Sequence, residues 1–105
     1  MSLLCDGIHL TSDTSLEELR AGAKECGLRL AYEQVSAHTN IPHYDVWARP
    51  KERALQLAEP VTTKELNRRA IRLVGGRPVK ADVYEAVRRR RAATREREPD
   101  AAHSD

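Results

Sequence analysis

The stretch from Thr14 to Gly27, TSLEELRAGAKECG, decides the fold because it carries a complete set of helix signals. Thr14 and Ser15 are both good N-cap residues, and a glutamate stands three residues after each of them, as a capping box requires. Apolar residues then recur at the spacing of one helical face, and Gly27 is a natural stop. The pattern predicts a helix whose inner face holds Leu16, Leu19, Ala23 and Cys26.

Extended segments are predicted on both sides of this helix. The short apolar run from Leu3 to Cys5 predicts a strand that is closed by Asp6-Gly7. Residues 28–35 alternate in polarity and predict a second strand, and the polar residues 36–41 predict a loop. Residues 42–47 combine a proline with β-branched and aromatic side chains, which favours an extended conformation.

Two further helices are expected in the second half of the chain. Pro50 suits the first turn of a short helix that Pro60 ends, with Ala54, Leu55 and Ala58 on its inner face. Val61-Thr62 would then form a short strand. Thr62 and Glu65 repeat the capping-box pattern and open a helix that ends at Gly75-Gly76. The expected buried face of that helix consists of Leu66, Ala70, Ile71 and Val74.

This alternation of helical and extended segments predicts an α/β or mixed α+β domain rather than a bundle or an all-β fold. We expect a small sheet of roughly three or four short strands packed by about three helices. If the strands were parallel, a binding crevice would lie at their carboxyl ends. The compact domain is predicted to span residues 1–76. Residues 77–105 are predicted to form a basic arm, helical at first, with Val79, Val83, Ala86 and Val87 as its docking stripe, and disordered toward the end.

Composition bounds the class of protein. A folded part of about 75 residues buries only roughly 60% of its unfolded surface, so a homo-oligomer is a reasonable expectation. No apolar run approaches the roughly 18 to 20 residues that cross a bilayer, and the first residues lack the basic start of a secretory signal. Cys5 and Cys26 form no C-x-x-C pair and are expected to be reduced and buried. We therefore expect a cytoplasmic protein without membrane contact.

The candidate catalytic residues are His9, Asp13, His43, Tyr44 and Asp45. Histidine is suited to proton transfer near neutrality, and a carboxylate beside an imidazole fixes its tautomer. In a strand, His43 and Asp45 share one face and Tyr44 points to the other, whereas in a loop Tyr44 could join the site. His9 and Asp13 precede the first helix, whose N-terminal end favours an anion. Together these groups could bind phosphate, directly or through a divalent metal.

Structural interpretations of the same residues stay open. Asp13 could serve only the helix start, His9 could be bonded to the backbone, and the triplet at 43–45 could be a turn in which Asp45 caps N–H groups. His38 and His43 are spaced like a loose metal pair, a pattern that is also typical of polar loops. The sequence holds no Gly-rich phosphate loop, serine-nucleophile elbow, His-Glu-x-x-His motif or zinc-type cysteine pattern. Ordinary nucleotide kinases, serine hydrolases and structural zinc modules are therefore poor candidates.

Several of these motifs resemble a recurrent bacterial and phage family, catalogued as domain of unknown function family 4031. The resemblance covers roughly residues 9 to 73, about three-fifths of the chain, and its most specific elements are the His-Tyr-Asp triplet and the His-Leu-x-Ser-Asp-Thr run. It implies which positions matter rather than what they do. The matching segments are His9-Leu10, Ser12-Asp13-Thr14, Glu18-Leu19, Gly27-Leu28, Pro42-His43-Tyr44-Asp45, Arg53-Ala54 and Lys64-Glu65-Leu66.

A run of arginines in the arm supports a different function. These side chains could neutralise several phosphates and attract DNA or RNA without regard to sequence. Four consecutive arginines point all round a helix, however, and Tyr84 is the one ring nearby for base stacking. A solubilising tail is the alternative. The residues concerned are Arg88, Arg89, Arg90 and Arg91, followed by Arg95 and Arg97.

Two main hypotheses follow. The first is a phosphate-directed hydrolase acting on a nucleotide or phosphodiester, in which His43 is general base or metal ligand and Asp45 orients it. His9 and Asp13 would form its phosphate or metal side. The second is a non-catalytic module that binds a nucleotide, a nucleic acid or a protein. A purely protein-directed regulator is a further possibility, and the sequence leaves open whether the protein is an enzyme.

Overall fold

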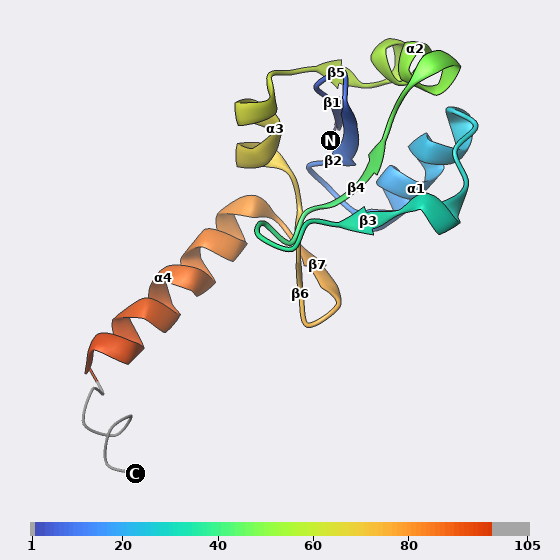
Figure 1. Ribbon diagram of the computed structural model, residues 1–105. Helices are drawn as coiled ribbons and strands as arrows, with labels where there is room; N and C mark the ends of the chain where they lie inside the picture. The colour runs from blue at the N-terminus through green and yellow to red at the C-terminus, as the bar shows by residue number, and fades with distance from the viewer. Residues whose placement is uncertain (1, 98–105) are drawn as a thin grey trace.

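A computed structural model describes residues 2–97 of the chain, with side chains described as far as residue 93 (Figure 1). The predicted disorder at the C-terminal end and His103 lie outside the described residues. The strands are β1 (Leu3–Cys5), β2 (His9–Ser12), β3 (Gln34–Val35), β4 (Pro42–Asp45), β5 (Glu59–Pro60), β6 (Arg72–Val74) and β7 (Arg77–Val79). The helices are α1 (Leu16–Glu25), α2 (Ala48–Leu57), α3 (Thr63–Arg69) and α4 (Ala81–Arg97), with a 3₁₀ turn at Leu30–Tyr32.

The main sheet has five strands in the order β3-β4-β2-β1-β5, and β6 and β7 form a separate hairpin. Within the main sheet, β5 runs parallel to β1 and the other pairs are antiparallel. The mixed α+β class is therefore confirmed, with more strands than the sequence predicted. Because the sheet is mainly antiparallel, the crevice expected at the carboxyl ends of parallel strands does not apply.

The main core lies between the sheet and the helices α1 and α2 (Figure 1). Ser15 caps α1 by accepting a hydrogen bond from the N–H of Glu18, as the sequence predicted, and Leu19 and Ala23 of this helix are fully buried. They pack toward a row of residues that lie opposite one another across three strands. That row consists of Cys5, Leu10 and Tyr44.

Other expectations for the first half of the chain need correction. Residues 28–35 form a 3₁₀ turn and the two-residue strand β3 rather than one long strand, and β2 was not predicted at all. The strand expected at Val61-Thr62 occurs at β5 instead. Leu55 is exposed on α2, so it does not belong to the inner face. For the strands the physical reason is shared, because short alternating segments follow their tertiary neighbours rather than their own polarity pattern.

The helix expected to run to Gly75 stops earlier. Thr62 caps α3 by accepting from the N–H of Glu65, as predicted, but α3 ends at Arg69. Residues 72–74 pair with residues 77–79, and Gly75-Gly76 form the hairpin turn, both with positive φ. Leu66 and Ile71 are buried as expected, although Ile71 lies between the helix and the hairpin. The hairpin also spans the predicted boundary at residue 76.

Helix α4 extends away from the rest of the molecule and is attached near its start (Figure 1). The Tyr84 hydroxyl accepts from Asn40 Nδ2 at 3.4 Å, and its ring lies 5.6 Å from the guanidinium carbon of Arg72. Arg72 is buried and donates to the carbonyls of Ala70 and Asn67. Docking therefore depends on Tyr84, whereas two members of the expected stripe, Val83 and Ala86, are exposed.

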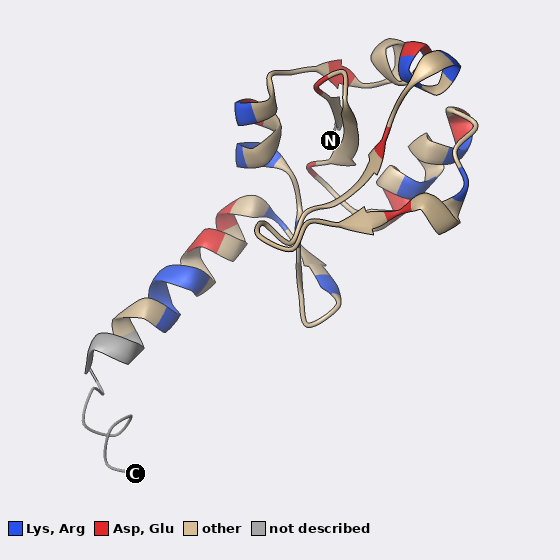
Figure 2. Cartoon of the chain, viewed as in Figure 1, with Lys and Arg blue, Asp and Glu red and all other residues tan. Residues whose placement is uncertain are grey.

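Charge changes sign along α4, from acidic residues in its first turns to arginines farther on (Figure 2). Within the described residues, none of the helices combines the length and the apolar character needed to cross a membrane.

Tyr44 holds β4 against the core. Its ring is fully buried, its hydroxyl donates to Glu33 Oε1 at 3.0 Å, and Glu33 in turn accepts two hydrogen bonds from Arg20. Burial raises the pKa of Tyr44 to about 12, and the hydrogen bond to Glu33 adds to the shift. Tyr44 is thus a neutral structural donor.

We predict that Tyr44→Phe lowers the free energy of unfolding by about 1 kcal/mol, because one buried hydrogen bond is lost while the ring keeps its packing. Urea denaturation followed by Trp47 fluorescence measures this change. Tyr32→Phe is the control, because Tyr32 is largely exposed and its variant should unfold at the wild-type midpoint. Equal midpoints for wild type and Tyr44→Phe would contradict the assignment.

Candidate metal centre

The pairing of β2 with β4 builds the candidate site. His9 of β2 lies directly opposite Asp45 of β4, and strand alternation places His43 on the same face as Asp45. The Nε2 atoms of His9 and His43 lie 3.9 and 3.7 Å from Asp45 Oδ1. The two rings meet edge to face, with centroids 5.3 Å apart. Within the described residues, these three side chains form a cluster whose ligand atoms all lie within 4.8 Å of one another.

Each imidazole is oriented by an acceptor at its other nitrogen. His9 Nδ1 lies 3.2 Å from Asp6 Oδ2, and His43 Nδ1 lies 3.0 Å from the carbonyl oxygen of Ile41. A carbonyl and an ionised carboxylate can only accept, so the proton of each neutral ring sits on Nδ1. In this tautomer both Nε2 atoms, which lie near Asp45 Oδ1, are left as acceptors, an arrangement typical of metal-binding histidines.

Asp6 is the outer support of His9. Its side chain is fully buried in the turn between β1 and β2. Burial acts to raise the pKa of this carboxyl, but hydrogen bonds from Ile8, His9 and Thr63 outweigh it and lower the pKa to about 2. Asp6 therefore remains ionised and an acceptor at neutral pH, so the proton of the neutral His9 tautomer sits on Nδ1.

A cleft of about 530 Å³ opens beside the two histidines, between the loop at residues 36–41 and helix α3. Hydroxyl, amide and imidazole groups dominate its polar lining, and none of the described residues that line it is an Asp or a Glu. The polar lining residues are His9, His43, His38, Ser36, Thr39, Gln34, Thr63 and Asn67. The cleft thus gives a small polar ligand access to the candidate site.

Asp13, predicted to act with His9, belongs to a different part of the molecule. Its carboxylate accepts from the N–H of Ser2, the hydroxyl of Thr14 and the guanidinium of Arg69. It lines a separate cleft with residues of α3 and α4. Three protein donors occupy the carboxylate, so we interpret Asp13 as a structural anchor that ties the N-terminus to α3 through Arg69.

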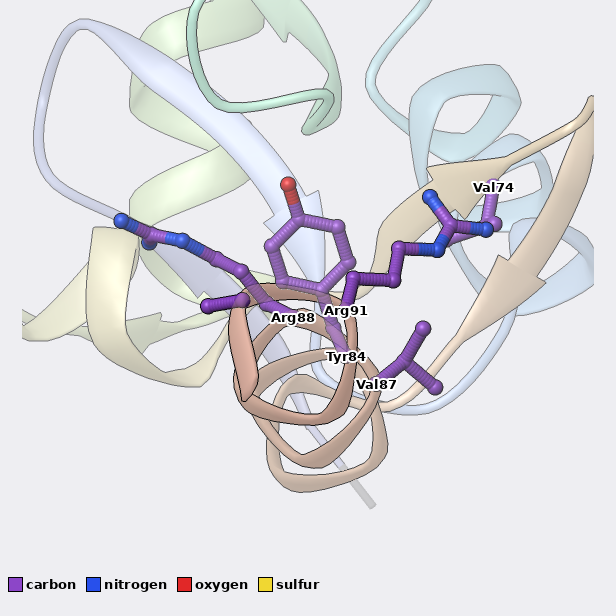
Figure 3. A pocket seen from close by; sticks show the side chains of 6 residues that line it. Val74, Tyr84, Val87, Arg88 and Arg91 are labelled. Atoms are coloured by element: carbon purple, nitrogen blue, oxygen red, sulfur yellow. The ribbon is translucent and has the colours of Figure 1, made fainter. Parts of the chain in front are cut away.

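Tyr44 also lies away from the site, because residues 42–45 are a strand and its side chain points into the core. The arginines 88–91 are exposed on α4, at a distance in the chain from the histidines. Arg88 and Arg91 border a groove of about 320 Å³ with Val74, Tyr84 and Val87. Figure 3 shows the two guanidinium groups extending to opposite sides of the Tyr84 ring.

Sequence reasoning missed or set aside three contributors to the site. Asp6 was assigned only to a turn, although an acidic turn residue three positions before a histidine could have suggested a partner for it. For His38 the sequence left open a loose metal pair with His43 and an ordinary polar loop, and Thr63 was not singled out. Nothing local in the sequence signals that α3 lies next to the histidine loop.

Fold and site together define a small α+β protein with a His/His/Asp cluster at the mouth of a polar cleft. Residues 6–73 match the family described as "Protein of unknown function (DUF4031)", and the chain belongs to that family. The matched region contains the three clustered side chains together with Asp6 and the whole cleft lining. No curated protein and no solved structure matches the chain significantly.

We predict that Asp13→Asn lowers the free energy of unfolding at pH 7 by about 1 to 2 kcal/mol, because charged hydrogen bonds are lost. Burial acts to raise the pKa of this carboxyl, but hydrogen bonds from Ser2, Thr14 and Arg69 lower it overall. A lowered pKa means that the stabilisation is present above the ordinary value of 3.8 and is lost as the pH falls below it. Urea denaturation should therefore show that wild type and Asp13→Asn differ less in free energy of unfolding at pH 3 than at pH 7. A difference that is unchanged at pH 3 would contradict this role.

Proposed function

We propose that the protein is a divalent-metal-dependent hydrolase of phosphate esters, with the metal bound by His9, His43 and Asp45. The single observation that carries the proposal is the convergence of two Nε2 atoms on one carboxylate oxygen, at 3.9 and 3.7 Å. Three electron-pair donors without a hydrogen between them repel one another unless a cation lies among them. Tetrahedral ligands about 2.1 Å from zinc lie about 3.4 Å apart. The ligand atoms here lie 3.7 and 3.9 Å from Asp45 Oδ1 and within 4.8 Å of one another, so small side-chain adjustments would complete such a site.

The outer contacts support a metal rather than a proton as that cation. Metal-bound histidines usually donate their second N–H to a carboxylate or a carbonyl, and His9 and His43 use one of each. Three protein ligands leave a fourth position for water, which is the pattern of catalytic rather than structural zinc sites. A metal at this position would lower the pKa of bound water to about 7 and polarise a phosphoryl oxygen.

The cleft favours an anionic ester as the substrate. Its lining offers hydroxyl donors from Ser36 and Thr39 and an amide donor from Asn67, all suited to phosphate oxygens, whereas the Thr63 hydroxyl already donates to Asp6. Among the described residues that line the cleft there is no carboxylate, and Asp6 and Asp45 lie against the histidines, where a bound cation would offset their charge. His38 lies in the same lining and is exposed, so it is available to protonate a leaving group. His43 thus acts as a ligand in this proposal and not as the general base.

We predict that the full chain binds one Zn²⁺ and that His9→Ala and His43→Ala each weaken binding at least 100-fold, because a ligand is removed. Isothermal titration calorimetry measures the affinity, and release of nitrophenolate from bis(4-nitrophenyl) phosphate measures turnover. Both variants should keep the wild-type circular dichroism spectrum and lose Zn²⁺-dependent turnover.

His38→Ala is the matched control for metal binding, because the same side chain is removed from the same cleft without removing a ligand. It should keep the wild-type affinity for Zn²⁺. Wild-type affinity in the His9 and His43 variants would remove the metal proposal. Unfolding of both variants would show that these residues are structural.

A second candidate function is nucleic-acid binding by α4. The supporting observation is the exposure of residues 88–91 on a helix that stands away from the compact part, with Arg88 and Arg91 beside one groove. Phosphates that contact these guanidinium groups would release counterions, which makes binding depend on salt.

We predict that Arg88→Gln/Arg91→Gln weakens binding to a mixed-sequence DNA duplex and reduces the salt slope by about 2, as expected for two lost phosphate contacts. Arg29→Gln/Arg49→Gln is the matched control, because it removes the same charge from exposed positions away from α4. Fluorescence anisotropy at two salt concentrations measures both. Equal losses in the two double variants would indicate general charge attraction rather than binding by α4. Substitution is preferable to truncation after residue 76, which would remove β7 from its hairpin.

A further inference from the structure

A second pocket adjoins the metal centre and is built around exposed aromatic side chains. It has a volume of about 380 Å³ and is lined by Ala31, Tyr32, Gln34, Asp45 and Trp47. The Trp47 and Tyr32 residues are 54% and 48% exposed. Single exposed apolar residues are common on protein surfaces, but two large aromatic residues in one pocket indicate a binding surface.

The small number of aromatic residues in this chain supports the interpretation of the pocket as a binding surface. The sequence contains one tryptophan, three tyrosines and no phenylalanine, and its core is built mainly from smaller side chains. A buried aromatic residue contributes more to stability than an exposed one. The chain nevertheless places Trp47 and Tyr32 at the surface, next to a candidate metal ligand.

Asp45 and Gln34 connect this pocket to the metal centre. Asp45 Oδ1 faces the two histidines, whereas Asp45 Oδ2 accepts from Gln34 Nε2 at 3.2 Å. Gln34 also lines the polar cleft. Only the Asp45 side chain would therefore separate a ligand in the aromatic pocket from a phosphate group bound at the histidines.

We propose that the pocket between Tyr32 and Trp47 binds the nucleobase of a nucleoside phosphate whose phosphate group lies at the His9/His43/Asp45 centre. The inference rests on the proposed function for the position of the phosphate. Stacking on aromatic rings suits any base, because every base has a π face. The Gln34 amide keeps its carbonyl oxygen and its second N–H available for the edge of the base, the pairing that glutamine makes with adenine.

Adenosine 5′-monophosphate and ribose 5-phosphate test this inference as a matched pair, because they differ only in the base. Trp47 is the one tryptophan of the chain, so its fluorescence reports directly on the pocket. With the Zn²⁺-loaded full chain, the nucleotide should quench this fluorescence saturably and bind about tenfold more tightly than the sugar phosphate. Calorimetry gives both affinities.

Two substitutions of Tyr32 distinguish stacking on its aromatic ring from simple filling of space by its side chain. Tyr32→Leu should weaken nucleotide binding about tenfold, while Tyr32→Phe should keep the wild-type affinity, because a phenyl ring still stacks. Leu55→Ala is the control, an exposed α2 side chain outside the pocket lining that should bind the nucleotide as wild type does.

The outcomes distinguish this inference from the proposed function. Zn²⁺-dependent diesterase turnover with equal affinity for the two ligands, or an unaffected Tyr32→Leu variant, would overturn the base pocket and leave the hydrolase standing. Saturable quenching that is weakened in Tyr32→Leu, without Zn²⁺-dependent turnover of bis(4-nitrophenyl) phosphate or the nucleotide, would support the pocket and remove the hydrolase. A dimer in light scattering whose Trp47 emission is already blue-shifted without nucleotide would assign the pocket to a second copy of the chain and overturn the inference.

Discussion

The register between β2 and β4 is the constraint on which the rest of the structure depends. Leu10 opposite Tyr44 fills the core, and the adjacent pair, His9 opposite Asp45, faces the other way. A slip by one residue would bring the polar pair into the core, so burial of Tyr44 fixes the position of the site. The hydrogen bond from Tyr44 to Glu33 strengthens this register from the core side. The strand register that packs the core therefore also assembles the site.

Asp13 and Asp45 carry the same carboxylate group but have different roles. Asp13 is saturated by protein donors and joins the N-terminus to α3, which leaves it little capacity for a ligand. Asp45 has one amide donor at Oδ2, and its Oδ1 faces imidazole nitrogens rather than a backbone donor. The number of protein donors that already hydrogen-bond to a carboxylate, more than the residue type, separates a structural carboxylate from one that is available for binding.

The loop at residues 36–41 links the polar cleft to the β6–β7 hairpin and to α4. Its inner side lines the polar cleft, and the carbonyl of Ile41 orients His43. At its far end, the Asn40 side chain contacts Tyr84 and the Asn40 carbonyl accepts from the N–H of Leu73. Cleft, hairpin and α4 therefore share one support, so the basic helix is held at a defined place beside the domain.

The sequence by itself determined the features that depend on near neighbours. The capped starts of α1 and α3, the strand β1, the extended segment at 42–45 and the shared face of His43 and Asp45 follow from local hydrogen bonding and strand alternation. Only the tertiary structure decided that His9 joins this pair, that Asp6 supports it, and that Asp13 does not. It also decided that residues 72–79 form a hairpin. These outcomes rest on contacts between distant segments, and for such contacts neither propensity nor periodicity carries information.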